Sequence, residues 1–385
     1  MKKNPFVYFI LSLAIAFGAC DDPVFYIISV EPPIAKPYIG GSPTNFIVFE
    51  NKMYVASGRN VYSYDGANWS LIDQPGGIIL QLAATDSYLY ALCYGGSGNN
   101  LKRMSSSLQN WEDVTGDTAG YDRFQSVYAA KDKVFIGAEK DNAFIILYID
   151  EALDLSFKPL TPEGTNEEPI AMLCGLASDS DNYYLCTRGG VIFVAPQNAP
   201  APETISKKNI DARFTGIINL GINDRIVAIS RDGSLYYIDP DADPGITKVP
   251  NVSFGDRSST GALAVWQDET GTLGDTPKLL LAGRQDRLDY SYNSGYTYGY
   301  LELELDAAGI KEGGNFVEPG KGSLSSAADY ERYVSTIGKY PVNHIFQTPA
   351  EIDPNMTLFA STQKNGVWSY RPRGSDDTPQ WNAED

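Results

Sequence analysis

The chain has 385 residues, with 48 acidic side chains against 30 Lys or Arg, so its formal charge is −18. This charge argues against nucleic acid as a partner, because phosphate backbones are bound through Lys and Arg, and equally against an anionic lipid surface. Tyr (25), Gly (36) and Pro (23) are abundant, and strand-forming aromatics combined with many turn residues favour an all-β chain.

Residues 1–19 have the features of a secretion signal. Two lysines precede an apolar stretch at residues 6–17, two small residues follow it, and Cys20 comes next. The apolar stretch is shorter than the roughly 20 residues that a membrane span needs. This order resembles a bacterial lipoprotein signal, although Phe17 stands where the usual motif has Leu. An ordinary signal peptide followed by a chance cysteine is the alternative.

The resemblance implies that the mature chain begins at Cys20 and carries acyl chains such as palmitate there. More than one acyl chain anchors a protein firmly, so we expect a membrane-anchored lipoprotein of the bacterial cell envelope, on the periplasmic face or the cell surface. Residues 20–43 are rich in Pro and Gly and predict an extended tether, or, for residues 24–31, a strand packed on the domain. Residues 44–385 form the predicted folded domain.

A short apolar phrase that ends in a small residue recurs along the domain. Its copies begin roughly 36 to 78 residues apart, and most follow an apolar strand and a polar turn. The copies read MYVAS at Met53, LYALC at Leu89, VFIGA at Val134, YYLCT at Tyr183, IVAIS at Ile226, LLAG at Leu280 and LFAST at Leu358. Each is followed by a turn and a further strand. Propeller blades repeat at about 40 to 50 residues.

These repeats predict a seven-bladed β-propeller, and six or eight blades would also fit. The apolar phrase would be the second strand of each blade, buried between neighbouring sheets. Its small residues would let the sheets approach closely; they are Ala56, Gly137, Ala228, Ala282 and Ala360. Either residues 380–385 or residues 25–30 would supply the strand that closes the ring.

Residues 63–69, SYDGANW, resemble the Asp-box of sialidase-like propellers, one residue shortened. Residues 105–111 repeat the Ser-to-Trp spacing without the Asp, and Ser369 and Trp381 bracket a longer, degraded copy. In such boxes the Asp stabilises a turn and the Trp packs beneath it. The resemblance therefore implies a structural role for Asp65 and Trp69. The chain also resembles pyrroloquinoline-type (PQQ) repeat propellers in its general pattern, without their Gly-to-Trp motif.

Few residues point to catalysis, and we expect no enzyme, no cofactor and no metal site. His344 is the single histidine, which disfavours hydrolytic triads and leaves no HExxH zinc motif; a structural role is expected for it. Asp239, Asp241 and Asp243 are spaced like calcium ligands, but flanking prolines and the missing bidentate Glu favour a solvated turn.

Cys174 and Cys186 flank a turn-like segment and could face each other across a hairpin. An envelope location would permit a disulfide between them, and two small buried thiols are the other interpretation.

Two insertions interrupt the repeats and supply the candidate binding residues. Residues 289–306 largely alternate and predict a long β-hairpin with tyrosines on both arms: Tyr290, Tyr292, Tyr296, Tyr298 and Tyr300. Residues 313–341 contain a predicted helix, whose apolar stripe includes Tyr330, Tyr333 and Ile337. The hairpin tyrosines would bind a partner or only cover a neighbouring loop, and the stripe would bind a partner or dock on its own domain.

Propeller topology would bring both insertions to one face, because links between blades and turns after second strands emerge together. We therefore expect a non-catalytic, lipid-anchored propeller whose tyrosine-rich rim binds another envelope protein or an extracellular polymer. A carbohydrate-binding propeller with tyrosines stacked on sugars is the first alternative. A glycoside hydrolase or lyase with acidic groups in the central channel is the second.

Overall fold

The computed structural model describes residues 38–95, 98–105, 110–114, 120–151, 154–160, 172–198, 206–242, 245–253, 259–267, 277–283, 300–311, 337, 342–373 and 376–384. The expected signal peptide and most of the expected tether therefore lie outside the described residues. So does the predicted helix, apart from Ile337. Within the described part there is no helix long and apolar enough to cross a membrane.

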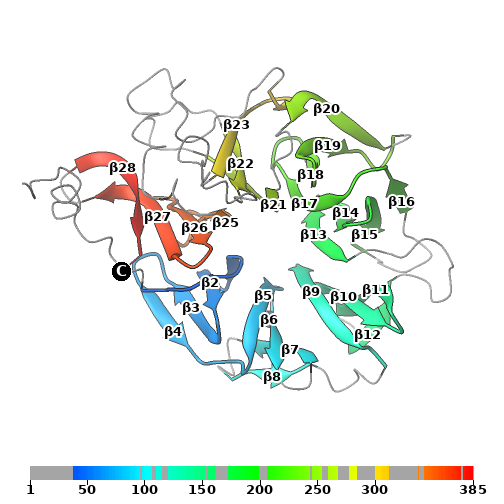
Figure 1. The fold of residues 1–385 in the computed structure, drawn as a ribbon, viewed down its shortest axis with the longest axis horizontal. Helices are drawn as coiled ribbons and strands as arrows, with labels where there is room; N and C mark the ends of the chain where they lie inside the picture. Colours follow the sequence, from blue (N-terminus) through cyan, green and yellow to red (C-terminus); the bar gives the residue numbers. More distant parts are fainter. Residues whose placement is uncertain are drawn as a thin grey trace, which may run out of the picture. The chain divides into compact units, whose positions relative to one another are not determined.

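The described strands form seven four-stranded antiparallel sheets arranged around a common axis, which confirms the seven-bladed propeller (Figure 1). Each blade is contiguous in sequence. The first three blades are β1(Ile47–Phe49) to β4(Trp69–Ile72), with β2(Lys52–Ser57) and β3(Asn60–Tyr64); β5(Ile78–Ala84), β6(Tyr88–Gly95), β7(Gly98–Ser105) and β8(Glu112–Asp113); and β9(Arg123–Ala130), β10(Lys133–Lys140), β11(Ala143–Asp150) and β12(Asp154–Pro159).

The remaining four blades repeat the same order. They are β13(Leu173–Ser178), β14(Asn182–Thr187), β15(Val191–Pro196) and β16(Ser206–Asn209); β17(Phe214–Asn219), β18(Ile226–Ser230), β19(Ser234–Ile238) and β20(Ile246–Ser253); β21(Ser259–Trp266), β22(Lys278–Gly283), β23(Tyr300–Asp306) and β24(Gly309–Ile310); and β25(Val342–Gln347), β26(Leu358–Thr362), β27(Gly366–Arg373) and β28(Asp376–Ala383).

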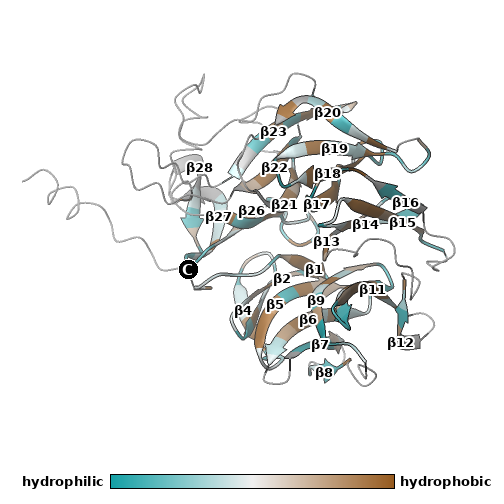
Figure 2. Cartoon of the chain, turned by 45° about the vertical axis from the view of Figure 1, so that its right-hand side comes forward, coloured by the Kyte–Doolittle hydropathy of each residue, from teal (hydrophilic) through white to brown (hydrophobic). Residues whose placement is uncertain are grey.

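The recurring apolar phrase forms the second strand of every blade, as the repeats predicted. Every residue of β18 and of β26 is buried. A sheet with neighbours on both faces has no solvent side, so its strands read as continuous apolar runs rather than alternating ones. Hydrophobic segments accordingly recur on strands throughout the ring (Figure 2).

Small residues allow the close approach of neighbouring sheets. A Cβ atom added to Gly137 on β10 would lie 2.6 Å from Ser126 Oγ and 3.2 Å from Leu173 Cβ of the fourth blade. Ala56 of β2 and Ala228 of β18 are also fully buried. Small side chains therefore let adjacent blades pack without a gap.

The hydrophobic core consists of clusters that are each shared by two adjacent blades. Polar side chains add hydrogen bonds between blades. Asn45 bonds to both the amide and the carbonyl of Leu82, at 3.0 and 2.8 Å, and Gln347 does the same to Gln267, at 3.0 and 2.7 Å. These amides satisfy backbone groups that would otherwise be unpaired at the blade junctions.

Among the described strands each blade is built from four consecutive ones, and the first and last blades are joined by packing and hydrogen bonding. Residues 380–385, one of the two expected closing segments, contribute to β28, the outermost strand of the last blade. Residues 25–30, the other, lie outside the described residues. Glu384, which is 2% exposed, accepts a hydrogen bond from Trp69 Nε1 of the first blade at 2.9 Å.

The segment before β1 also binds the last blade. Gly41 O accepts from Gly366 N at 2.9 Å, and Ile39 O accepts from Val367 N at 3.1 Å. Ile39 and Phe46 join a cluster that contains Phe359 of β26. Contacts with the propeller thus begin within residues 38–43, which the sequence assigned to the tether.

Candidate functional site

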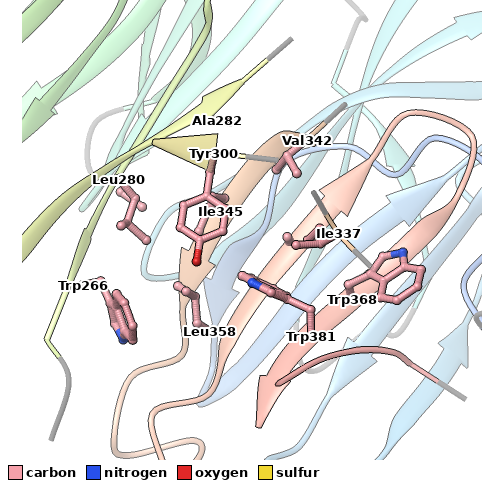
Figure 3. Close-up of a cluster of buried hydrophobic side chains, with 12 residues drawn as sticks. Trp266, Leu280, Ala282, Tyr300, Ile337, Val342, Ile345, Leu358, Trp368 and Trp381 are labelled. Carbon is pink, nitrogen blue, oxygen red and sulfur yellow. The ribbon is translucent and has the colours of Figure 1, made fainter. Parts of the chain in front are cut away.

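Most of the predicted site residues lie outside the described residues: Cys20, Tyr290, Tyr292, Tyr296, Tyr298, Tyr330 and Tyr333. Tyr300 is described, and its expected exposure is wrong. It begins β23, is 1% exposed, and its ring packs edge-on against Trp381 with centroids 5.7 Å apart (Figure 3). Tyr300 is buried because a neighbouring blade covers this side of β23, so its ring belongs to the core.

Ile337, from the predicted apolar stripe, is also buried in this cluster, with Trp368 and Trp381 (Figure 3). At this residue the stripe docks on its own domain. The strand order places both insertions as expected: residues 284–299 join the second and third strands of the sixth blade, and residues 312–341 join the sixth blade to the seventh. Both connect strand ends on the same face of the ring.

We call this face the link face. It carries the turns after second strands and the links between blades. In the described chain these are residues 58–59, 73–77, 114, 120–122, 141–142, 160, 172, 188–190, 210–213, 231–233, 311, 337 and 363–365. First strands of successive blades contact one another around the axis. Residues at the start of a first strand therefore lie at the inner edge of the link face.

Exposed apolar side chains gather at that inner edge in the second blade. Ile78 opens β5 and pairs in register with Tyr94 of β6, and Leu80 occupies a β-bulge two residues further on. Their exposed fractions are 46% for Ile78, 57% for Tyr94 and 45% for Leu80. We call Ile78, Leu80 and Tyr94 the apolar patch. Such exposure of neighbouring large apolar groups is typical of an interaction surface.

The Asp65 turn has a structural role. Asp65 Oδ1 accepts hydrogen bonds from the amides of Ala67 and Asn68 at 3.0 and 2.8 Å, and these bonds lower the pKa of Asp65. Trp69 packs edge-on against Phe359 of the last blade, with ring centroids 5.6 Å apart. The turn and its tryptophan therefore help to join the first blade to the last.

A half-buried carboxylate links the second and third blades. Glu151, just after β11, accepts hydrogen bonds from the hydroxyls of Thr85 and Tyr90. Burial raises the pKa of Glu151, while the hydrogen bonds from Tyr90 and Thr85 and the charge of Arg103 lower it in part. Because its donors belong to the neighbouring blade, Glu151 acts as a junction between sheets.

His344 lies in β25, where it pairs in register with Ser361 of β26. Burial lowers the pKa of His344 to about 4, so the imidazole is neutral at physiological pH. A neutral, partly buried imidazole on an inner strand is consistent with the structural role expected from the sequence.

The suggested calcium loop is held by turn hydrogen bonds over its described residues. Asp239 Oδ1 accepts from the amide of Asp241 at 3.0 Å, and Asp239 N donates to Gly245 O at 2.8 Å. Asp243 lies outside the described residues. In the described part of the chain, His, Cys, Asp and Glu side chains form no group suited to a metal ion.

Cys174 and Cys186 are free thiols whose sulfur atoms lie 3.8 Å apart. Cys174 occupies a bulge in β13 next to Cys186 of β14. Burial raises the pKa of Cys186 well above its usual range, which disfavours the reactive thiolate. The two sulfur atoms face each other across adjacent strands, as the sequence suggested.

Solved propellers resemble this chain in fold. They include YCF48 bound to a D1 peptide (13% identity over 88% of this chain and 94% of that chain, TM-score 0.52) and the Cps50 (Swd1) β-propeller domain of Myceliophteria thermophila (10% identity, 91% and 98% coverage, TM-score 0.53). PorZ, a surface component of the type-IX secretion system of Porphyromonas gingivalis, is similar over 91% of this chain and 39% of its own (10% identity, TM-score 0.50). No family model and no curated protein matches the chain.

Proposed function

We propose that this chain is a non-catalytic, protein-binding propeller of the bacterial envelope, held at the membrane by lipid on Cys20. The observation that carries the binding role is the apolar patch on the link face. Leaving Ile78, Leu80 and Tyr94 in water forgoes burial worth about 25 cal/mol per Å² of apolar surface. A partner segment that covers them would recover that free energy, and Tyr94 offers a large ring with a polar tip.

Two further features support binding at the link face. The tyrosine-rich insertion of the sixth blade and the insertion before the seventh both connect strand ends there. Loops on a rigid scaffold are a common location for binding residues. Among proteins of similar fold, YCF48 was solved with a peptide bound, and PorZ is described as a bacterial surface component. Binding of a protein partner at the cell surface is therefore the function we propose first.

The binding role is tested by site-specific photo-crosslinking in cells that produce the full chain. A photoreactive residue at Tyr94 should give a discrete adduct with a partner protein, because this side chain is exposed beside the proposed docking surface. The same residue at Leu71 is the matched control: Leu71 is 52% exposed but lies on β4, the outermost strand of the first blade. Equal adducts at both positions, or none at Tyr94, would contradict the proposal.

The anchor is tested separately by the Cys20→Ser variant. If Cys20 carries lipid, labelled palmitate should be incorporated into the wild type and not into the variant. The variant should also leave the membrane fraction, since the acyl chains are its proposed attachment. A Cys93→Ser variant controls for loss of a thiol, because Cys93 is buried in the second blade. Membrane association that persists in Cys20→Ser without label would argue for another means of attachment.

A further inference from the structure

The fourth and fifth blades carry three exposed arginines on one continuous part of the link face: Arg188, Arg213 and Arg231. We call them the arginine cluster. Arg231 N donates to Arg213 O at 2.6 Å, which joins the turn after β18 to the link before β17. The turn that contains Arg188 contacts the same link, because Ile210 N donates to Gly190 O at 3.1 Å.

In the third blade, an arginine at the start of the first strand is neutralised by an acidic residue on the second strand. Arg123 begins β9 and faces Glu139 of β10 in register, and its Nε lies 2.6 Å from Glu139 Oε2. In that blade Phe124 pairs with Ala138, just as Phe214 pairs with Ser230 in the fifth. Arg213 is therefore equivalent to Arg123, and Arg231 occupies the place of Glu139.

The fifth blade thus sets two arginines at facing positions where the third has an ion pair. Like charges directly opposite on neighbouring strands are destabilising. In the fourth blade the place of Glu139 is taken by Arg188, the residue after the Leu173–Thr187 pair. Three arginines therefore lie on adjoining segments of backbone, in a chain whose formal charge is −18.

Among the described residues, two acidic side chains, Asp232 and Asp211, share this region, and neither replaces Glu139. Asp232 accepts hydrogen bonds from the hydroxyls of Ser230 and Ser234 and from the amide of Ser234. The Ser230 hydrogen bond is the main cause of its lowered pKa, so this carboxylate is committed to its own turn. Asp211 is exposed in the link between the fourth and fifth blades. The arginine cluster keeps a positive excess over these two carboxylates.

We propose that the arginine cluster binds carboxylates of an acidic peptide segment in the partner protein, an inference that rests on the proposed function. Guanidinium groups bind carboxylates through paired, charge-assisted hydrogen bonds, and a bound carboxylate would take the role that Glu139 has in the third blade. The apolar patch lies on the same face, two to three blades away around the ring. The recognised segment would therefore combine acidic with apolar residues.

The net negative charge of the chain sharpens this inference. An acidic peptide is repelled by the protein as a whole, so it binds only where local positive charge and apolar contact outweigh that repulsion. A basic peptide, by contrast, would be attracted weakly to many places. Preference for an acidic segment would consequently identify a specific site.

The test uses fluorescence anisotropy with the full purified chain and a labelled peptide of about eight residues that alternates leucine with aspartate, which spans up to about 28 Å when extended. A leucine–serine peptide of equal length is the neutral comparison. The acidic peptide should bind more tightly than the neutral one, and its binding should weaken as salt screens the arginines. Equal affinity of the two peptides, or no saturable binding, would overturn the proposal.

The Arg213→Ala/Arg231→Ala double variant should weaken binding of the acidic peptide about tenfold or more, because charge-assisted hydrogen bonds are lost. The matched control is Arg59→Ala/Lys364→Ala, which removes two exposed cations from the link face of the first and seventh blades. It should change affinity no more than about twofold, as expected for distant screened charges. Equal weakening by both doubles would show only general electrostatic attraction and overturn the site.

Failure of this inference and failure of the proposed function are distinguishable. If the Tyr94 adduct forms equally in wild type and in Arg213→Ala/Arg231→Ala, and the acidic peptide does not bind, the docking surface stands and acidic recognition is wrong. If the acidic peptide binds through the arginine cluster while Tyr94 gives no adduct, the acidic site stands and the apolar patch is not part of the interface.

Discussion

Gly66→Ala is expected to lower the free energy of unfolding by about 3 kcal/mol, combining a strained backbone with a steric clash at the ring closure. Gly66 has a φ of +97°, and a Cβ atom there would lie 2.0 Å from Ile352 O and 3.1 Å from Ile352 C. These are backbone atoms, so no side-chain rotation relieves the contact. The first blade would have to move away from the last.

Gly76→Ala is the matched control for the backbone contribution. Its φ of +83° is also positive, and a Cβ atom there would have no neighbour within 4 Å. It should cost about 1 kcal/mol, the usual penalty for a residue with a side chain in this region. Urea unfolding of both variants measures the difference. If Gly66→Ala loses no more than Gly76→Ala, the contact between Gly66 and Ile352 does not stabilise the closed ring.

The blade pattern was predictable because its cause is local. A second strand covered on both faces must be apolar along its whole length, so IVAIS at residues 226–230 and LFAST at 358–362 are recognisable wherever they occur. Ring closure was not predictable in the same way. β28 contains few apolar residues. Its pairing with β27 is local, but the hydrogen bond between Trp69 and Glu384 joins segments that are far apart in sequence.

The tyrosines of the sixth-blade insertion were harder to interpret. Tyrosine at every second position is found both in an exposed hairpin and in a strand that packs between two blades. Tyr300 continues the alternating series of the expected hairpin, yet β23 begins with it and the neighbouring sheet covers its ring. Ile78 and Leu80 present the opposite case. They look like core residues in sequence, yet both are exposed, with buried Ile79 between them on the opposite face of β5.

The arginine cluster had one sequence signal, the pair Arg-Phe at residues 123–124 and again at 213–214. That repeat marks equivalent positions in two blades. It does not show that Glu139 faces the first arginine and Arg231 the second, because cross-strand partners are set by register. The charge reversal between the two blades therefore became apparent only from the pairing of β9 with β10 and of β17 with β18.

Lys133→Met should lower the free energy of unfolding by about 3–5 kcal/mol, because it leaves a buried carboxylate without its cation. Lys133 begins β10, and its Nζ lies 2.9 Å from Asp150 Oδ1; the two side chains are 7% and 8% exposed. Burial alone would lower the pKa of Lys133, but hydrogen bonds to Asp132 and Asp150 raise it above the usual value. The lysine therefore stays charged inside the third blade.

Asp150→Asn is expected to cost less, about 1–3 kcal/mol, because Lys133 keeps a second partner in Asp132 at 2.8 Å, whose side chain is 43% exposed. Lys133→Met with Asp150→Leu should recover part of the loss, since replacing both charges leaves neither ion unpaired. Chemical denaturation of the two single variants and this double variant measures their free energies of unfolding and so tests the predicted ranking. If Asp150→Asn costs as much as Lys133→Met, Asp132 does not support the lysine. If Lys133→Met is neutral, Asp150 reaches water and the pair is not buried in solution.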